Sequence, residues 1–228
     1  ILSFPPHLVR QYIDRFGLRS GQTILDPFCG TGTTLVESKI QGIDSVGIEA
    51  NPMAHFASTV KVNWCIASDG LINHARRIVD YAEKIVQAER FGNLRTLSVE
   101  VNSILLKNSI SPLPLHKSLI LLEAIRFHKD ERYYNHELLA FAKVLVFSIS
   151  NLHFGPEVGV RRLKKNDAFV TEDWIKEILS MADDLRAAPA QRADAEVYHA
   201  DSRHLSAVLQ PNSIDAVFTS PPYPNEKD

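Results

Sequence analysis

The stretch "LDPFCGTGTTLVES", Leu25–Ser38, joins an apolar strand to a helix through an acidic residue, a proline and two closely spaced glycines. The pattern predicts a strand at residues 23–28 and a helix at residues 33–42. A second strand is expected at residues 45–50, and "NPMAHFASTVKV" then opens a helix with Asn51 as its N-cap. This order of strand, glycine turn, helix and strand predicts the βαβ unit of a doubly wound α/β sheet.

The glycine turn indicates a nucleoside-bearing cofactor. Gly30 and Gly32 let the backbone turn tightly and approach a ligand, and Glu49 ends the next strand, where a carboxylate can accept both ribose hydroxyls. A dinucleotide fingerprint requires a third glycine, but Leu35 occupies that place. The Gly-Lys-Ser/Thr sequence of a phosphate loop is also missing, so the pattern does not imply a nucleoside triphosphate.

A second motif, "TSPPY" at Thr219–Tyr223, follows the short apolar strand "DAVF". The two prolines fix the backbone and remove two N–H donors, so the carbonyl groups of this segment can face a ligand purely as acceptors. An exocyclic amino group is a ligand of that kind. Tyr223 offers a flat face on which an extruded base can stack.

Between the two motifs the strand pattern stops. Residues 64–194 read as helix or loop, and strand-like segments return only at residues 195–201 and 213–222. A crossover between parallel strands needs about a dozen residues, so a large helical insertion between the second and third strands is expected. The expected organisation is therefore a sheet-forming part at 1–63, the helical insertion at 64–194, and a continuation of the sheet-forming part at 195–228 that carries the second motif and ends after the fourth strand.

The composition is that of a folded protein without a strong charge signature. The 228 residues are 45% hydrophobic and 23% charged, with a formal net charge of −2, so any nucleic-acid surface must be local or must lie outside this chain. Cys29 and Cys65 form neither a disulfide framework nor a metal-ligand spacing, which favours a reducing, cytoplasmic location and no bound metal. No apolar run reaches the length of a membrane span, so no membrane partner is expected.

Together, "DPFCGTGTT", "GIEANP", "ADSRHL" and "TSPPY" resemble the S-adenosylmethionine-dependent DNA amino-methyltransferases, the enzymes of restriction–modification systems. The serine of "SPPY" is more similar to the cytosine-N4 branch than to the adenine-N6 branch. The resemblance covers about residues 1–60 and 195–225, and it implies a Rossmann-like methyltransferase sheet, S-adenosylmethionine as cofactor and DNA as partner. The abrupt end after "PNEKD" raises the expectation that a C-terminal part of the same protein is missing.

The resemblance assigns roles position by position. The methionine and ribose side of the cofactor would be lined by Asp26, Phe28, Gly30 and Gly32. Glu49 would bind the ribose hydroxyls, and Asp201 would lie near the adenine amino group. The target base would be held by Ser220, Pro221, Pro222 and Tyr223.

The implied reaction is methyl transfer to the N4 amino group of cytosine, by direct displacement and without a covalent enzyme intermediate. A carbon-5 cytosine methyltransferase would need a cysteine nucleophile after proline, whereas Cys29 follows Phe28 in the cofactor loop. Three alternatives stay open: an adenine-N6 DNA methyltransferase, an RNA amino-methyltransferase, and a catalytically inactive cofactor-binding fragment. The oligomeric state and any companion nuclease are not indicated.

One further segment of the insertion is strongly basic. Four cations, Arg161, Arg162, Lys164 and Lys165, fall within five residues. Such a run is most often solvated surface, and contact with DNA phosphates is the second interpretation.

Overall fold

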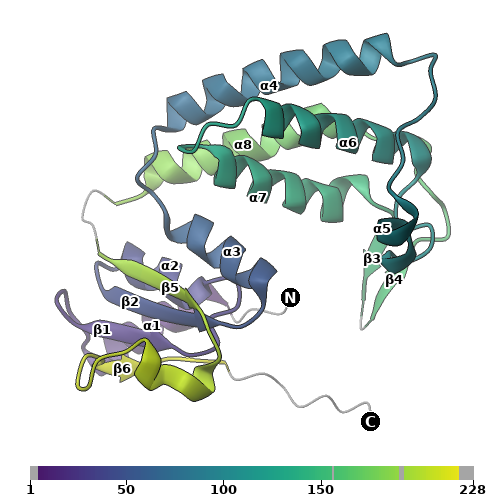
Figure 1. Ribbon diagram of the computed structural model, residues 1–228. Coiled ribbons are helices and arrows are strands. Elements are labelled where there is room, and N and C mark those ends of the chain that lie inside the picture. The colour runs from purple at the N-terminus through teal and green to yellow at the C-terminus, as the bar shows by residue number, and fades with distance from the viewer. Residues whose placement is uncertain (1–4, 156, 190–192, 221–228) are drawn as a thin grey trace. The chain divides into compact units, whose positions relative to one another are not determined.

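The computed structural model describes residues 5–155, 157–189 and 193–220. The chain divides into two compact units, the first formed by Ile1–Cys65 with Ala188–Asp228 and the second by Ile66–Ala187 (Figure 1). The second unit begins two residues later than the insertion expected at 64–194 and ends seven residues earlier. Residues 64–65 and 188–194 belong instead to the sheet-bearing unit.

The first unit contains a four-stranded sheet in which all neighbours are parallel. Its strands are β1 (Thr23–Asp26), β2 (Asp44–Glu49), β5 (Ala195–His199) and β6 (Ala216–Val217). Their order across the sheet is β5-β2-β1-β6, which is the 3-2-1-4 order of a Rossmann-like half when the four strands are numbered along the chain. The predicted parallel α/β sheet is therefore confirmed. Strands β2 and β5 lie on one side of β1 and strand β6 lies on the other, so the strand order reverses between β1 and β6. In such folds, ligands bind at this point, beyond the carboxyl ends of the strands.

The described part of this unit contains the α-helices α1 (Pro6–Phe16), α2 (Thr33–Ile40) and α3 (Pro52–Val62). Helix α1 buries Val9 and Ile13 in a cluster with Ile24 of β1. Helix α3 begins as predicted, because the Asn51 side chain accepts hydrogen bonds from the backbone N–H groups of Met53 and Ala54.

The second unit consists mainly of helices around a single apolar core. They are α4 (Ser68–Ala88), α5 (Val99–Ile104), α6 (Pro112–Phe127), α7 (Tyr134–Val144) and α8 (Val170–Ala187), with a π-helical turn at Leu145–Ile149. Helices α4, α6, α7 and α8 pack against one another, and Trp174 is fully buried among them. Arg186, near the end of α8, pairs with Asp69 at the start of α4 with 2.6 Å between nitrogen and oxygen, so the two ends of the unit lie side by side.

The expectation of only helix and loop in this region is wrong at one place. Strands β3 (Leu152–Phe154) and β4 (Val158–Val160) pair antiparallel in a small two-stranded sheet. Each has only three residues, which is too short for an alternating pattern to be recognised in sequence. Asn151, 1% exposed, stabilises the base of the pair, because its backbone carbonyl accepts the N–H of Arg161 at 2.8 Å.

Within the described residues, no helix combines the length and the apolar character that crossing a membrane requires.

Candidate functional site

Asp26 ends β1 and lies at the carboxyl edge of the sheet, with 1% of its surface exposed. Its carboxylate accepts the Thr34 hydroxyl at 2.6 Å and the Phe28 N–H at 3.1 Å. Burial raises the pKa of Asp26, and these hydrogen bonds oppose that rise. A buried carboxylate that keeps lone pairs available can accept a cationic ligand.

The glycine loop is joined to the second strand through Glu49. The backbone N–H of Gly30 donates to one oxygen of the Glu49 carboxylate at 2.8 Å, and the N–H of Asn51 donates to the other at 2.7 Å. Gly30 has a φ of +54°, and a Cβ added there would meet no atom within 4 Å. The loop therefore presents bare backbone to open space beside a carboxylate, which fits the approach of a nucleoside.

Gly32 has a different structural role. Its φ is +82°, and an added Cβ would lie 2.9 Å from the Cβ of Ser58 in α3. The glycine is required because the loop passes directly over that helix.

The other residues predicted to bind the cofactor lie around the same edge. Phe28 is 44% exposed. Asp201 follows β5 and caps a 3₁₀-helix at Ser202–Ala207, where it accepts the N–H of Arg203 at 2.9 Å. The Arg203 guanidinium lowers the pKa of Asp201, so this carboxylate is ionised.

Two contacts at this edge were not foreseen from the sequence. The Ser202 hydroxyl donates to the carbonyl of Pro27, which joins the loop after β5 to the loop after β1. Thr34 orients Asp26. Thr34 lies within the "GTGTT" motif, but Thr31 and Thr33 stand nearer to Asp26 in the sequence, so the motif alone does not identify the donor. Ser202 offers no sequence signal.

Strand β6 brings the second motif next to the first. Leu25 of β1 pairs with Val217, and the N–H of Phe218 donates to the carbonyl of Leu25 at 2.9 Å. The Thr219 hydroxyl lies near enough to Asp26 to lower its pKa, although its geometry falls short of a well-formed hydrogen bond. Ser220 is the next residue and is partly buried. The remaining predicted residues of this motif, Pro221, Pro222 and Tyr223, lie outside the described residues.

Cys29 is buried beneath the glycine loop with 6% exposure. Burial and the nearby carboxylates of Asp26 and Glu49 raise the pKa of its thiol to about 12. A thiol of this kind is protonated at neutral pH and is a poor nucleophile.

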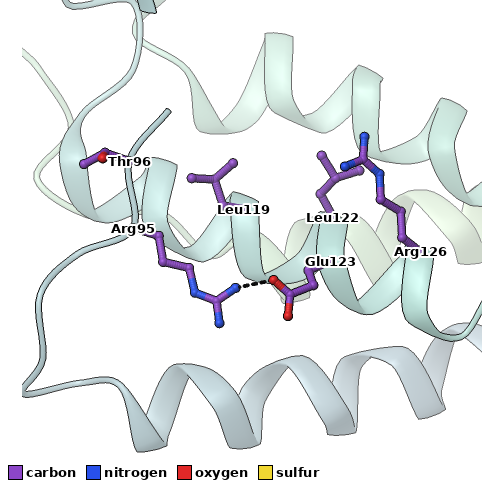
Figure 2. Close-up of a pocket in the computed structure, with 6 residues that line it drawn as sticks. All are labelled: Arg95, Thr96, Leu119, Leu122, Glu123 and Arg126. Atoms are coloured by element: carbon purple, nitrogen blue, oxygen red, sulfur yellow. Dashed lines mark hydrogen bonds and ion pairs between the residues drawn. The ribbon is translucent and has the colours of Figure 1, made fainter. Parts of the chain in front are cut away.

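The second unit has a pocket of its own, with a volume of about 560 Å³ (Figure 2). The Arg95 guanidinium at its edge pairs with Glu123 at 2.7 Å and with Glu89 at 2.6 Å. Because two carboxylates already neutralise this arginine, the pocket does not resemble an anion site. Its lining consists of Arg95, Thr96, Leu119, Leu122, Glu123 and Arg126.

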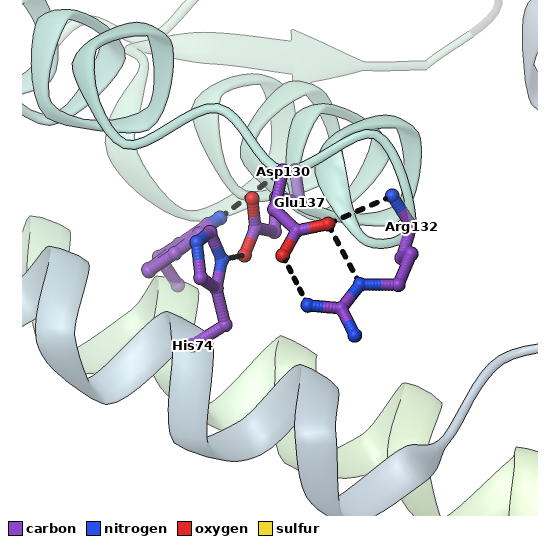
Figure 3. Close-up of polar contacts among 5 residues, drawn as sticks. His74, Asp130, Arg132 and Glu137 are labelled. Atoms are coloured by element: carbon purple, nitrogen blue, oxygen red, sulfur yellow. Dashed lines mark hydrogen bonds and ion pairs between the residues drawn. The ribbon is translucent and has the colours of Figure 1, made fainter.

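A buried polar pair crosses the core of the second unit (Figure 3). His74 of α4 hydrogen-bonds through Nδ1 to the Glu137 carboxylate of α7, and both side chains are almost completely buried. Burial raises the pKa of Glu137, and the contact with His74 opposes that rise. No group of three or more metal-ligating side chains occurs in the part of the chain that the structure describes, so this pair is interpreted as a link between two helices.

Comparison with known proteins yields several matches. A family model described as DNA methylase matches residues 2–58. Over 99% of its length the chain is 28% identical, across 246 aligned positions, to Type II methyltransferase M.BsoBI of Geobacillus stearothermophilus, 48% of which is covered. The corresponding identity to Type II methyltransferase M.AvaI of Nostoc sp. (strain PCC 7120) is 26% across 256 positions, covering 99% of this chain and 49% of that protein.

A shorter match involves an RNA enzyme. The tRNA (guanine(10)-N2)-dimethyltransferase of Methanothermobacter thermautotrophicus is 43% identical over 47 residues, which are 21% of this chain and 14% of that protein. The chain thus spans about half the length of the two type II methyltransferases and shares only a local segment with the RNA enzyme.

Proposed function

We propose that this chain is part of a DNA amino-methyltransferase of the cytosine-N4 and adenine-N6 family, and that its protein methylates N4 of cytosine in DNA. The observation that carries the proposal is the pairing of β1 with β6, which puts Asp26 and Thr219–Ser220 at neighbouring strand ends. A cofactor loop and an amine-binding segment must be neighbours for a methyl group to pass directly from one to the other.

The residues at the sheet edge fit S-adenosylmethionine. The Asp26 carboxylate suits the methionine ammonium group, and Glu49 retains lone pairs for ribose hydroxyls while its oxygens bind Gly30 and Asn51. The open space in front of Gly30 leaves room for the ligand. Phe28 and Asp201 are the proposed contacts for the remainder of the cofactor.

S-adenosylmethionine, when bound, supplies an electrophilic methyl group on a sulfonium sulfur. The chain's part is orientation. Ser220 and the carbonyl of Pro221 would accept hydrogen bonds from the target amino group, hold its lone pair in line with the methyl carbon, and favour the pyramidal geometry of the attacking nitrogen. Tyr223 would stack on the extruded base. The protonated Cys29 takes no part.

The choice of cytosine rests on Ser220, because the adenine-N6 branch commonly has Asp or Asn at this place. Adenine N6 is the second candidate within the family. The local identity to a tRNA dimethyltransferase specifically favours an RNA substrate as a third candidate.

Mass spectrometry of nucleosides distinguishes these candidates. The intact enzyme would be incubated with labelled S-adenosylmethionine and either unmethylated duplex DNA or tRNA, and each product would then be digested. N4-methylcytosine from DNA supports the proposal, whereas N6-methyladenine or a methylated tRNA nucleoside replaces it with the corresponding alternative. A protein that binds S-adenosylmethionine in calorimetry but methylates neither substrate would be an inactive cofactor-binding protein.

A further inference from the structure

The basic segment Arg161–Lys165 follows β4 in the second unit, and its charge is not neutralised by acidic partners. Arg161, Arg162 and Lys164 are exposed, and no carboxylate forms an ion pair with them anywhere in the described ranges. Within the same ranges, the ammonium group of Lys164 donates to the backbone carbonyls of Arg161 and Arg162, and Nε of Arg161 donates to the carbonyl of Leu152 at 3.2 Å. The exposed cations are therefore available to an anionic partner.

The nearby acidic residue Asp167 is already engaged. Both of its oxygens accept the Lys117 ammonium group, at 2.6 and 2.8 Å. Each exposed pair of this kind contributes little to stability, but it removes the carboxylate from the neighbourhood of the basic segment. The local charge of the segment consequently remains positive on a chain whose formal net charge is −2.

The backbone of the basic segment is fixed at both ends. The carbonyl of Asn151 accepts the N–H of Arg161 at 2.8 Å, and the side-chain oxygen of Asn151 accepts the N–H of Lys165 at 3.0 Å. The Asn151 amide in turn donates to the Asn108 carbonyl and the Ser111 hydroxyl, each at 3.1 Å. One buried residue thus holds the segment in a defined position before any ligand binds, through its backbone carbonyl at one end and its side-chain oxygen at the other.

Lys165 differs from the other three cations. It is partly buried, and its ammonium group donates to the carbonyl of Ser148 in the π-helical turn. This lysine secures the segment to the helical core, whereas Arg161, Arg162 and Lys164 face solvent.

The adjacent strand pair adds exposed apolar surface. Phe154 of β3 is 45% exposed, Val158 of β4 is 55% exposed, and Leu163 between the cations is 90% exposed. The rings of Phe154 and Phe147 lie 5.2 Å apart. The surface therefore combines positive charge with protruding apolar side chains. A two-stranded β-ribbon is also narrow enough to enter the major groove of DNA.

We propose that β3, β4 and the segment Arg161–Lys165 form a DNA-binding surface, in which Arg161, Arg162 and Lys164 contact backbone phosphates. The choice of DNA as the polyanion rests on the proposed function. The argument for a polyanion rests on the unneutralised cations and their fixed backbone alone. Phosphate contacts supply affinity and register without reading sequence.

The test compares two triple variants of the full-length protein. In the first, Arg161→Gln, Arg162→Gln and Lys164→Gln remove the exposed cations and leave Lys165 in place. The matched control replaces Arg76, Lys84 and Arg90 with Gln, because these exposed cations of the same unit give an equal charge change elsewhere. Duplex DNA binding is followed by fluorescence anisotropy from 50 to 200 mM salt, with structured RNA as a parallel probe.

Each lost phosphate contact reduces the magnitude of the slope of log affinity against log salt concentration by about 1. The slope of the first variant should therefore be about 2–3 smaller in magnitude than that of wild type, and its affinity at low salt should be about 10- to 100-fold weaker. The control should keep the wild-type slope. An equal loss in both variants, or an unchanged slope in the first, overturns the proposal. Wild-type binding of RNA but not of DNA also overturns it.

The outcomes separate this proposal from the proposed function. If the wild-type protein methylates cytosine in DNA while the first variant binds DNA normally, only the surface assignment fails. If the wild-type protein methylates tRNA instead, the proposed function fails regardless of the slopes. Calorimetry with S-adenosylhomocysteine should give the same affinity for both variants, because the substitutions lie outside the cofactor-binding unit.

Discussion

At the scale of single residues, Cys29 illustrates how burial sets reactivity. With a pKa of about 12, about one Cys29 thiol in 10,000 is ionised at pH 8. Iodoacetamide at that pH should therefore modify the exposed Cys65 and leave Cys29 unmodified in the folded protein. Peptide mass spectrometry measures both sites, and denatured protein labelled at both is the control. Rapid labelling of native Cys29 would contradict the assigned burial.

Glu49 is the second residue with a specific expectation. Replacing it with Ala removes the proposed acceptor for ribose hydroxyls and leaves the N–H groups of Gly30 and Asn51 without this carboxylate. Cofactor binding should weaken by about 1.5–3 kcal/mol, which calorimetry measures. Glu49→Gln is the matched control, because its amide keeps one acceptor oxygen and replaces the other with an NH2 donor. Its affinity should fall between those of wild type and Glu49→Ala. Unchanged affinity in Glu49→Ala would remove Glu49 from the site.

At the scale of elements, the packing of the glycine loop on α3 can be tested with two glycines. Gly32→Ala combines a left-handed φ with a 2.9 Å approach to Ser58, whereas Gly21→Ala has a similar φ and open space. The left-handed conformation alone costs about 1–2 kcal/mol, and a clash in a packed region adds about 1–3 kcal/mol. Denaturant unfolding should show the larger loss for Gly32→Ala. Equal losses would mean that the loop moves away from α3 freely.

The elements also show which features sequence can predict. The start of α3 was foreseen because Asn51 caps a helix through its own next residues. The small sheet of β3 and β4 was not, because strands of three residues are too short to show an alternating pattern. The contact of Ser202 was missed for a different reason, because its partner Pro27 is 175 residues away and no motif links the two.

At the scale of the whole molecule, the proposed cofactor site and the basic segment belong to different units. A ligand that binds only the folded state at 100 times its dissociation constant stabilises that state by about 2.7 kcal/mol. With S-adenosylhomocysteine as the probe, slowed hydrogen exchange is expected in residues 23–50 and 195–220. Protection confined to residues 66–187 would place the ligand in the helical unit and refute the site.

The contact between Asp69 and Arg186 has a consequence for how the chain folds. Strands β2 and β5 are neighbours in the sheet, yet Ser45 pairs with Ala195, 150 positions later in the sequence. Closing so long a loop from an unstructured chain is entropically unfavourable and slows folding. Once the helical unit has formed, its adjacent ends bring β5 close to β2 in space, so the two strands can pair after the inserted residues have been synthesised. Separation of those two ends would leave the edge of β2 unpaired and open to association with another chain.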